Sequence, residues 1–132
     1  MLHAIFKRKG IYLEENRIFK DIEFVNLYND AFNLKSAGNY RGAIEKLEKV
    51  LQIGPRDFAW AYALMGEQYY FLNDYSQSEK YLKKAIEMDE HCMYARICLL
   101  KIYEKKNMKL EAQQEEEKIF EYNPSLFGLR KR

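Results

Sequence analysis

A repeat of 34 to 35 residues constrains this chain more than any other feature of its sequence. The chain aligns with itself at an offset of 35 residues and then at a further offset of 34, and residue classes are kept at both steps. The aligned sets are Leu34, Tyr69 and Tyr103; Ala31, Gly66 and Leu100; Gly38, Asn73 and Asn107; Val50, Ala85 and Ile119; and Pro55, Glu90 and Pro124. A fixed period of this length is the signature of stacked repeat units.

The sequence of each unit predicts two helices with a short break between them. The breaks fall at Gly38-Asn39, Asn73-Asp74 and Lys106-Asn107, where residues leave the right-handed helical region at little cost. The units are residues 24–57, 59–92 and 93–126, with Phe58 as one extra residue. Their apolar faces are covered only when neighbouring hairpins stack.

The pattern of these units resembles the tetratricopeptide repeat (TPR) family. The residues that carry it are Leu27, Ala31, Leu34, Ala43, Leu47, Val50 and Pro55 in the first unit, and Tyr62, Gly66, Tyr69, Ser78, Leu82 and Ala85 in the second. The resemblance implies an all-α solenoid, a right-handed superhelix of three helical hairpins. The third unit departs from the pattern, with Arg96 and Glu116 at large apolar places and Leu100 at a small one.

Two segments lie outside the repeats. Residues 1–23 are expected to form an N-terminal extension that is helical from about residue 11, and residues 127–132 a basic C-terminal tail. The polar run QQEEEK, residues 113–118, predicts that the last helix ends the stack as its own solvated cap.

The sequence contains no convincing set of catalytic or cofactor-binding residues. His3 and His91 have no nucleophile at a suitable spacing, and the glycines form no phosphate-binding loop. Cys92 and Cys98 would point about 240° apart around a helix, so they are not expected to share a metal. We therefore expect no enzyme activity, no small-molecule substrate, no cofactor and no metal.

Charge and hydropathy limit the other classes of function. The formal net charge of +2 argues against nucleic-acid binding, because only the chain ends carry basic clusters. The aromatic stretch at residues 58–75 contains Glu67, Asn73 and Asp74, which argues against membrane insertion. We see no signal-peptide pattern and two cysteines without a disulfide-rich context, and we expect a cytoplasmic protein.

The same aromatic stretch has two apolar faces when it is drawn as a helix. Tyr62, Gly66 and Tyr69 share one face, and the family resemblance implies that Tyr62, Tyr69 and Tyr75 are structural. On the other face the resemblance implies a concave groove. Its expected residues are Tyr28, Asn29, Phe32, Trp60, Leu64, Glu67, Tyr70, Phe71, Tyr94, Ile97 and Lys101.

An aromatic groove of this kind predicts a protein-binding adaptor or chaperone-like module that takes an apolar or amphipathic peptide or helix. The alternative is structural self-assembly, in which the N-terminal segment or a homodimer partner fills the groove. TPR domains that hold chaperone tails use a clamp of Lys, Asn and Arg, and the matching places here include Tyr28, Phe32 and Leu64. Binding of an acidic tail by that clamp is therefore not expected.

Overall fold

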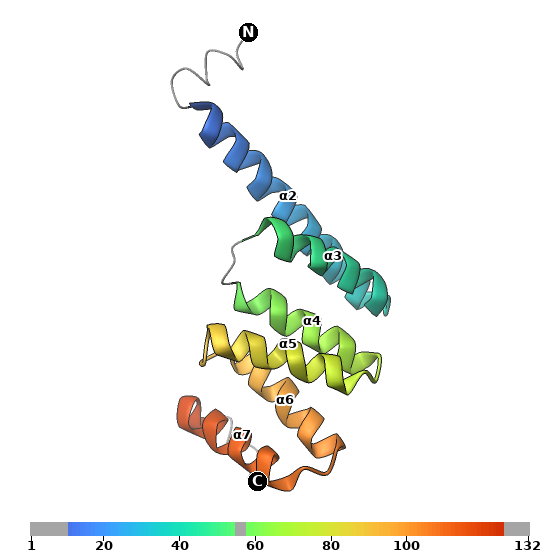
Figure 1. Cartoon of the computed structure of the whole chain (residues 1–132), viewed down its shortest axis with the longest axis vertical. Helices are drawn as coiled ribbons and strands as arrows, with labels where there is room; N and C mark the ends of the chain where they lie inside the picture. Colours follow the sequence, from blue (N-terminus) through green and yellow to red (C-terminus); the bar gives the residue numbers. More distant parts are fainter. Residues whose placement is uncertain (1–10, 55–57, 126–132) are drawn as a thin grey trace. The chain divides into compact units, whose positions relative to one another are not determined.

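The chain folds into paired α-helices. The computed structural model describes the backbone of residues 11–54 and 58–125, with side chains from residue 19 onward in those ranges. Within them lie six helices and no strand: α2 (Ile11–Ser36), α3 (Tyr40–Ile53), α4 (Ala59–Phe71), α5 (Tyr75–Met88), α6 (Met93–Lys105) and α7 (Lys109–Tyr122) (Figure 1). The all-α helical-repeat prediction is confirmed. The helices belong to two compact units, Met1–Arg56 and Asp57–Arg132, each of which is described by itself.

Each hairpin turns at a residue in the left-handed region of backbone space. Gly38 has a φ of 81°, Asn73 of 63° and Asn107 of 61°. Glycine and asparagine adopt this conformation more readily than other residues, which explains why they occupy aligned places in the repeat. Asn39 and Asp74 then cap the following helices, accepting hydrogen bonds of 3.0 and 3.2 Å from backbone N–H groups three residues further on. The predicted breaks between helices are confirmed.

The N-terminal unit is a hairpin of two unequal helices. α2 has 26 residues and α3 has 14, and α2 runs without a break from the predicted extension into the first predicted repeat. Ala31 on α2 is buried, as are Ala43, Leu47 and Val50 on α3. Residues 1–10, Pro55 and the predicted tail at residues 127–132 lie outside the described residues.

The C-terminal unit has a core shared by α4, α5 and α6. Its buried members include Ala59, Ala63, Leu82, Leu99 and Ile102. α4 and α5 approach closely at Gly66, where an added Cβ would lie 2.6 Å from Cγ of Leu82. The hydroxyl of Ser78 donates a hydrogen bond to the carbonyl oxygen of Gly66 and fixes this crossing. Small residues at these repeat places therefore allow α4 and α5 to approach closely.

Stacked tyrosines hold the outer side of the same hairpin. Tyr81 lies between Tyr62 and Tyr69, with ring centroids 6.3 and 5.5 Å away and interplanar angles of 24° and 6°. Tyr75 packs against Tyr70 at 5.6 Å and against the core. Tyr62, Tyr69 and Tyr75 therefore have the structural role that was predicted for them. In α7, no side chain of residues 113–118 is buried, consistent with the expected solvated last helix.

Candidate binding surface on α4 and α6

Two aromatic side chains from successive hairpins meet at the N-terminal ends of α4 and α6. The rings of Trp60 and Tyr94 lie 4.8 Å apart at an angle of 37°. Both helices contribute to the shared core through Ala59, Ala63 and Ala95, whose small side chains keep the helices close. Trp60 nevertheless keeps 40% of its surface exposed. The core thus presents a rigid, partly exposed aromatic pair.

A second aromatic group lies at the C-terminal end of α4. Phe71 is 41% exposed, and its ring lies 5.8 Å from that of Tyr70 in an edge-on arrangement. Residues 60 and 71 are eleven positions apart, which places them within about 20° of each other around a helix and about 16 Å apart along it. Trp60 and Phe71 therefore mark the two ends of one stripe on α4, and each end is exposed.

Polar side chains accompany this stripe. Glu67 on α4 is half-buried, and its Oε1 accepts a hydrogen bond of 3.3 Å from Nε2 of Gln68. On α6, Ile97 is half-buried and Lys101 is exposed. Among the residues expected in a groove, Trp60, Glu67, Tyr70, Phe71, Tyr94, Ile97 and Lys101 thus all retain surface on α4 or α6. We name these seven residues the α4–α6 surface.

Leu64 does not belong to this surface, and its prediction is wrong. It is only 2% exposed, between Ala63 and Met65, which are both fully buried. The middle of α4 is covered, whereas its two ends, at Trp60 and Phe71, remain exposed. Cys98 of α6 is likewise only 6% exposed and packs in the core. Helical spacing predicts the direction in which a side chain points, but it does not predict how deeply the side chain is buried.

The remaining predicted residues lie on α2, in the N-terminal unit. Tyr28 stacks on Phe24 at a centroid distance of 6.1 Å and lies at an angle of 53° to Phe32, at 5.3 Å. Burial raises the pKa of the Tyr28 hydroxyl to about 12. Nζ of Lys35 lies 5.5 Å from the centre of the Phe32 ring. Asn29 is exposed. These residues form an aromatic ladder along one helix, which we treat separately from the α4–α6 surface.

A buried ionic cluster between α6 and α7 escaped the sequence analysis. Arg96 is 6% exposed, its Nη1 donates to Oε2 of Glu115 at 2.9 Å, and its Nε donates to the carbonyl oxygen of Glu90 at 2.8 Å. The guanidinium also lies 5.5 Å from the centre of the Tyr122 ring. Arg96 thus replaces an apolar repeat residue by binding an acidic partner on the next helix. A glutamate at a half-buried place nineteen residues further on was the signal that could have revealed it.

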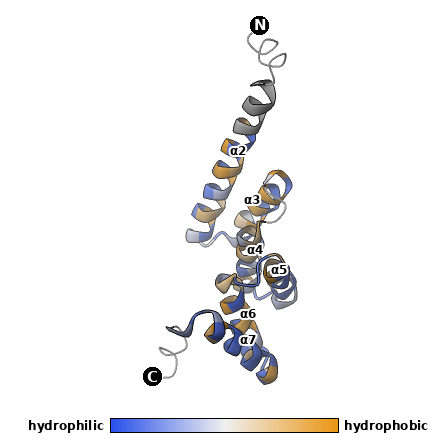
Figure 2. Ribbon diagram, turned by 90° about the vertical axis from the view of Figure 1, so that its left-hand side faces the viewer, coloured by the Kyte–Doolittle hydropathy of each residue, from blue (hydrophilic) through white to orange (hydrophobic). Residues whose placement is uncertain are grey.

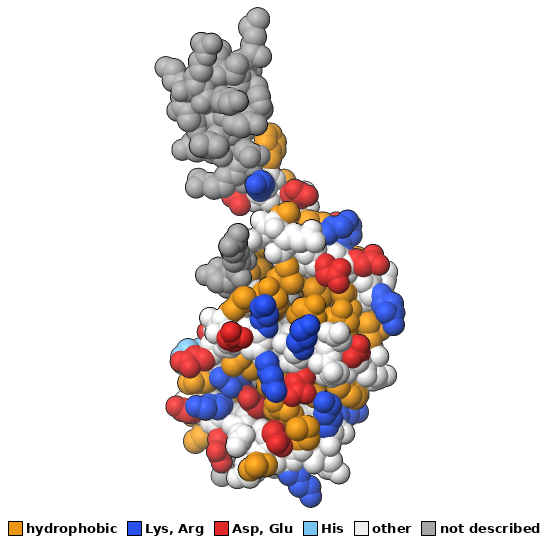
Figure 3. Space-filling view, in the orientation of Figure 1, with side chains coloured by type: hydrophobic (Ala, Val, Ile, Leu, Met, Phe, Trp, Pro, Cys, Tyr) orange, Lys and Arg blue, Asp and Glu red, His pale blue; other side chains and the backbone are white. Residues whose placement is uncertain are grey.

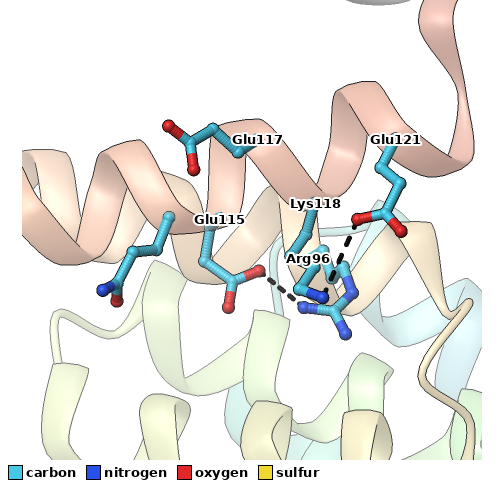
Figure 4. A pocket seen from close by; sticks show the side chains of 6 residues that line it. Arg96, Glu115, Glu117, Lys118 and Glu121 are labelled. Carbon is cyan, nitrogen blue, oxygen red and sulfur yellow. Dashed lines mark hydrogen bonds and ion pairs between the residues drawn. The ribbon is translucent and has the colours of Figure 1, made fainter.

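The cavity beside this cluster has a volume of about 520 Å³ (Figure 4). Arg96 and Glu115 face each other in it, and Lys118 lies 3.8 Å from Glu121. Gln114 and Glu117 complete the lining. Of the two ion pairs in the lining, Arg96–Glu115 links α6 to α7, whereas Lys118–Glu121 lies within α7.

The described side chains offer no metal centre, because no three His, Cys, Asp or Glu residues among them could hold an ion. Cys92 and Cys98 are free and buried, and burial raises the pKa of the Cys92 thiol. A buried thiol with a raised pKa is a poor nucleophile.

Charge on the visible face is mixed. Over α5 to α7, Lys and Arg side chains alternate with Asp and Glu (Figure 3). A basic footprint for nucleic acid would show as a continuous patch. Among the described residues, no helix combines the length and the apolar character needed to cross a membrane.

Helical hairpins whose turns recur every 34 to 35 residues define an α-helical repeat protein. Residues 34–96 match the model of the tetratricopeptide repeat family, and they contain the second helical hairpin. This match confirms, over residues 34–96, the resemblance to the tetratricopeptide repeat family that the repeat pattern had predicted.

Solved structures show the same fold. The structure of the first TPR of Spaghetti (RPAP3) bound to the HSP90 peptide SRMEEVD is similar with a TM-score of 0.72 and 17% sequence identity, over 77% of this chain and 82% of that one. The crystal structure of MamA is similar with a TM-score of 0.71 and 19% identity, over 94% of this chain and 75% of that one. No curated protein sequence matches this chain.

Proposed function

We propose that this protein is a non-enzymatic adaptor whose α4–α6 surface binds an apolar or amphipathic segment of another protein. The observation that carries the proposal is the Trp60–Tyr94 pair, in which a tryptophan held by a neighbouring ring keeps 40% of its surface exposed. Tryptophan and tyrosine dominate binding energy at protein interfaces because they bury a large area with few rotatable bonds.

The dimensions of the stripe suggest the length of the ligand. The distance of about 16 Å between residues 60 and 71 corresponds to eleven residues of helix or about five residues of extended chain. An amphipathic helix with apolar residues at both ends of one face would therefore contact Trp60 and Phe71 together. Glu67 and Lys101 flank the stripe with opposite charges and would fix the direction of the ligand.

The HSP90 peptide bound to the Spaghetti TPR is acidic, as its sequence SRMEEVD shows. Here Tyr94 and the buried residues Leu64 and Cys98 occupy places where the carboxylate clamp of TPR domains carries polar or basic side chains. We therefore assign an apolar ligand rather than an acidic tail. Free, buried cysteines suit a reducing compartment, and we place the protein in the cytoplasm.

The sequence provides its own reporter for a direct test, because Trp60 is the only tryptophan. A library of amphipathic helical peptides is titrated into the protein while tryptophan emission is followed. For a peptide that binds at the α4–α6 surface, we expect the emission to shift toward shorter wavelengths and to saturate.

Substitution then identifies the residues responsible. The double variant Trp60→Ala with Phe71→Ala is expected to bind the same peptides about 30-fold more weakly by calorimetry, the equivalent of about 2 kcal/mol. Leu110→Ala, at a residue of α7 that is 64% exposed, is the matched control and should bind as the wild type does. Equal affinity in the wild type and the double variant would show that the proposal is wrong.

A further inference from the structure

α2 is much longer than the helix that pairs with it. Phe24 lies beside Gly54, at the C-terminal end of α3. The contact is so close that a Cβ added to Gly54 would collide with the Phe24 ring. The part of α2 that precedes Phe24 therefore extends beyond α3, by about 20 Å for thirteen residues (Figure 1). Figure 2 shows apolar residues among polar ones along the part of α2 whose side chains are described. Apolar residues that form a contiguous exposed patch often mark an interaction site.

Three exposed apolar residues of α2 follow a coiled-coil spacing, while Phe19, which is 60% exposed, lies at an e place beside them. Ile22 is 51% exposed, Val25 is 50% exposed and Phe32 is 37% exposed. Together with Asn29 they are separated by three, four and three positions, which is the alternation of a and d places in a heptad. Ile18 continues the same register toward the N-terminus. A hollow of about 280 Å³ lies on this seam between Ile22 and Val25.

We infer that this seam binds α2 of a second copy of the chain, in a parallel two-stranded coiled coil. Asn29 occupies an a place, and a single asparagine there selects a parallel, in-register dimer because the two amides pair with each other. In a parallel, in-register pair of identical chains, the two Asn29 amides lie in the same layer by symmetry. A different helix would bury Asn29 unpaired unless it carried its own polar residue at that layer.

The residues that flank the seam are compatible with the dimer. In a parallel pair, Asp21 faces Asn26 of the other copy, and Tyr28 faces Asn33. Neither pair brings two like charges together, so no repulsion opposes association. The seam uses Asn29 and Phe32, which the sequence analysis assigned to a peptide groove, and it uses none of the α4–α6 surface. The two proposals can thus fail independently.

Sedimentation equilibrium of the full chain tests the dimer. Between about 1 and 200 µM we expect the mass to rise from monomer to dimer, as for a short seam of micromolar affinity. Val25→Asp places two carboxylates at the centre of the seam and is expected to weaken association at least about tenfold. Leu110→Asp changes another exposed apolar residue and should leave the mass unchanged. Circular dichroism should show the same helix content in both variants.

A cysteine at the proposed layer tests the register. Under mild oxidation Asn29→Cys should form a disulfide-linked dimer, because identical a places face each other only in a parallel, in-register pair. The wild type should stay unlinked, since Cys92 and Cys98 are buried. A wild-type chain that is monomeric at every concentration would overturn the inference and leave the seam to a different protein. A dimer that survives Val25→Asp, or that does not cross-link through residue 29, would overturn it as well.

Discussion

Arg96 and Glu115 form a salt bridge of 2.9 Å between α6 and α7, with only 8% and 16% of their side chains exposed. Desolvation makes such a pair a weak source of net stability, but it makes the loss of one partner severe. The bridge stands where the repeat pattern expects an apolar contact. The attachment of the last helix thus depends on two charges being present together.

Removal of one partner is therefore predicted to be destabilising. Glu115→Ala leaves the guanidinium of Arg96 buried without its carboxylate, and we expect the free energy of unfolding to fall by about 3 kcal/mol in urea titrations. Glu117→Ala, an exposed change on the same helix, should have an effect of less than about 0.5 kcal/mol. The double variant Arg96→Leu with Glu115→Leu should recover much of the loss. A full loss in the double variant would contradict this account.

The close crossing of α4 and α5 gives a second prediction. Gly66→Ala would place Cβ 2.6 Å from Cγ of Leu82 and 3.1 Å from the carbonyl oxygen of Ser78. The helices must separate to relieve this overlap, which is expected to destabilise the protein by about 1–3 kcal/mol despite the better helix propensity of alanine. The measurement is the thermal midpoint, with Glu87→Ala on the exposed side of α5 as control. A raised midpoint in Gly66→Ala would refute the predicted overlap.

The turn residues with a left-handed backbone conformation give a third prediction. Asn107 has a φ of 61°, a conformation that costs a residue with a Cβ about 1 kcal/mol or more and costs glycine very little. Asn107→Ala should lower the free energy of unfolding by about 1 kcal/mol, whereas Asn107→Gly should be close to neutral. Paired urea titrations of the two variants measure the difference. Equal stabilities would mean that the backbone conformation is not the cause.

Tyr28 should titrate at an unusually high pH. Burial raises its pKa from 10.0 to about 12, so the folded state retains a proton that the unfolded state releases. The stabilisation from Tyr28 is complete below pH 10 and is lost as the pH rises through about 12. Absorbance titration of tyrosinate should therefore lose amplitude near pH 12 in Tyr28→Phe. A loss of amplitude near pH 10 in that variant would instead show that Tyr28 ionises like an exposed tyrosine.

Sequence analysis predicted the backbone better than the surface. Aligning Gly38, Asn73 and Asn107 correctly located the three turns, because a left-handed backbone conformation is a local property of the residue that adopts it. Gly66 and Ser78 belong to the repeat pattern, and the close helix approach at these places excludes large side chains. These features depend on the residue and its repeat position.

Burial and ion pairing depend on residues that are far away in sequence. Leu64 projects in nearly the same direction as Trp60, but only the cover supplied by the folded chain makes one buried and the other exposed. Arg96 looked like a defect in the repeat until Glu115 was found opposite it. The expected surface residues could therefore be assigned to helices from the sequence, while the exposure of each one required the structure.

The stacked rings of Tyr62, Tyr81 and Tyr69 all belong to the α4–α5 hairpin. Near-ultraviolet circular dichroism reports fixed aromatic packing, whereas the far-ultraviolet signal reports helix content alone. The part of the near-ultraviolet spectrum that disappears in Tyr81→Leu would thus provide a spectroscopic marker for one hairpin. Followed during heating, this marker would show whether the middle repeat loses its side-chain order before its helices melt.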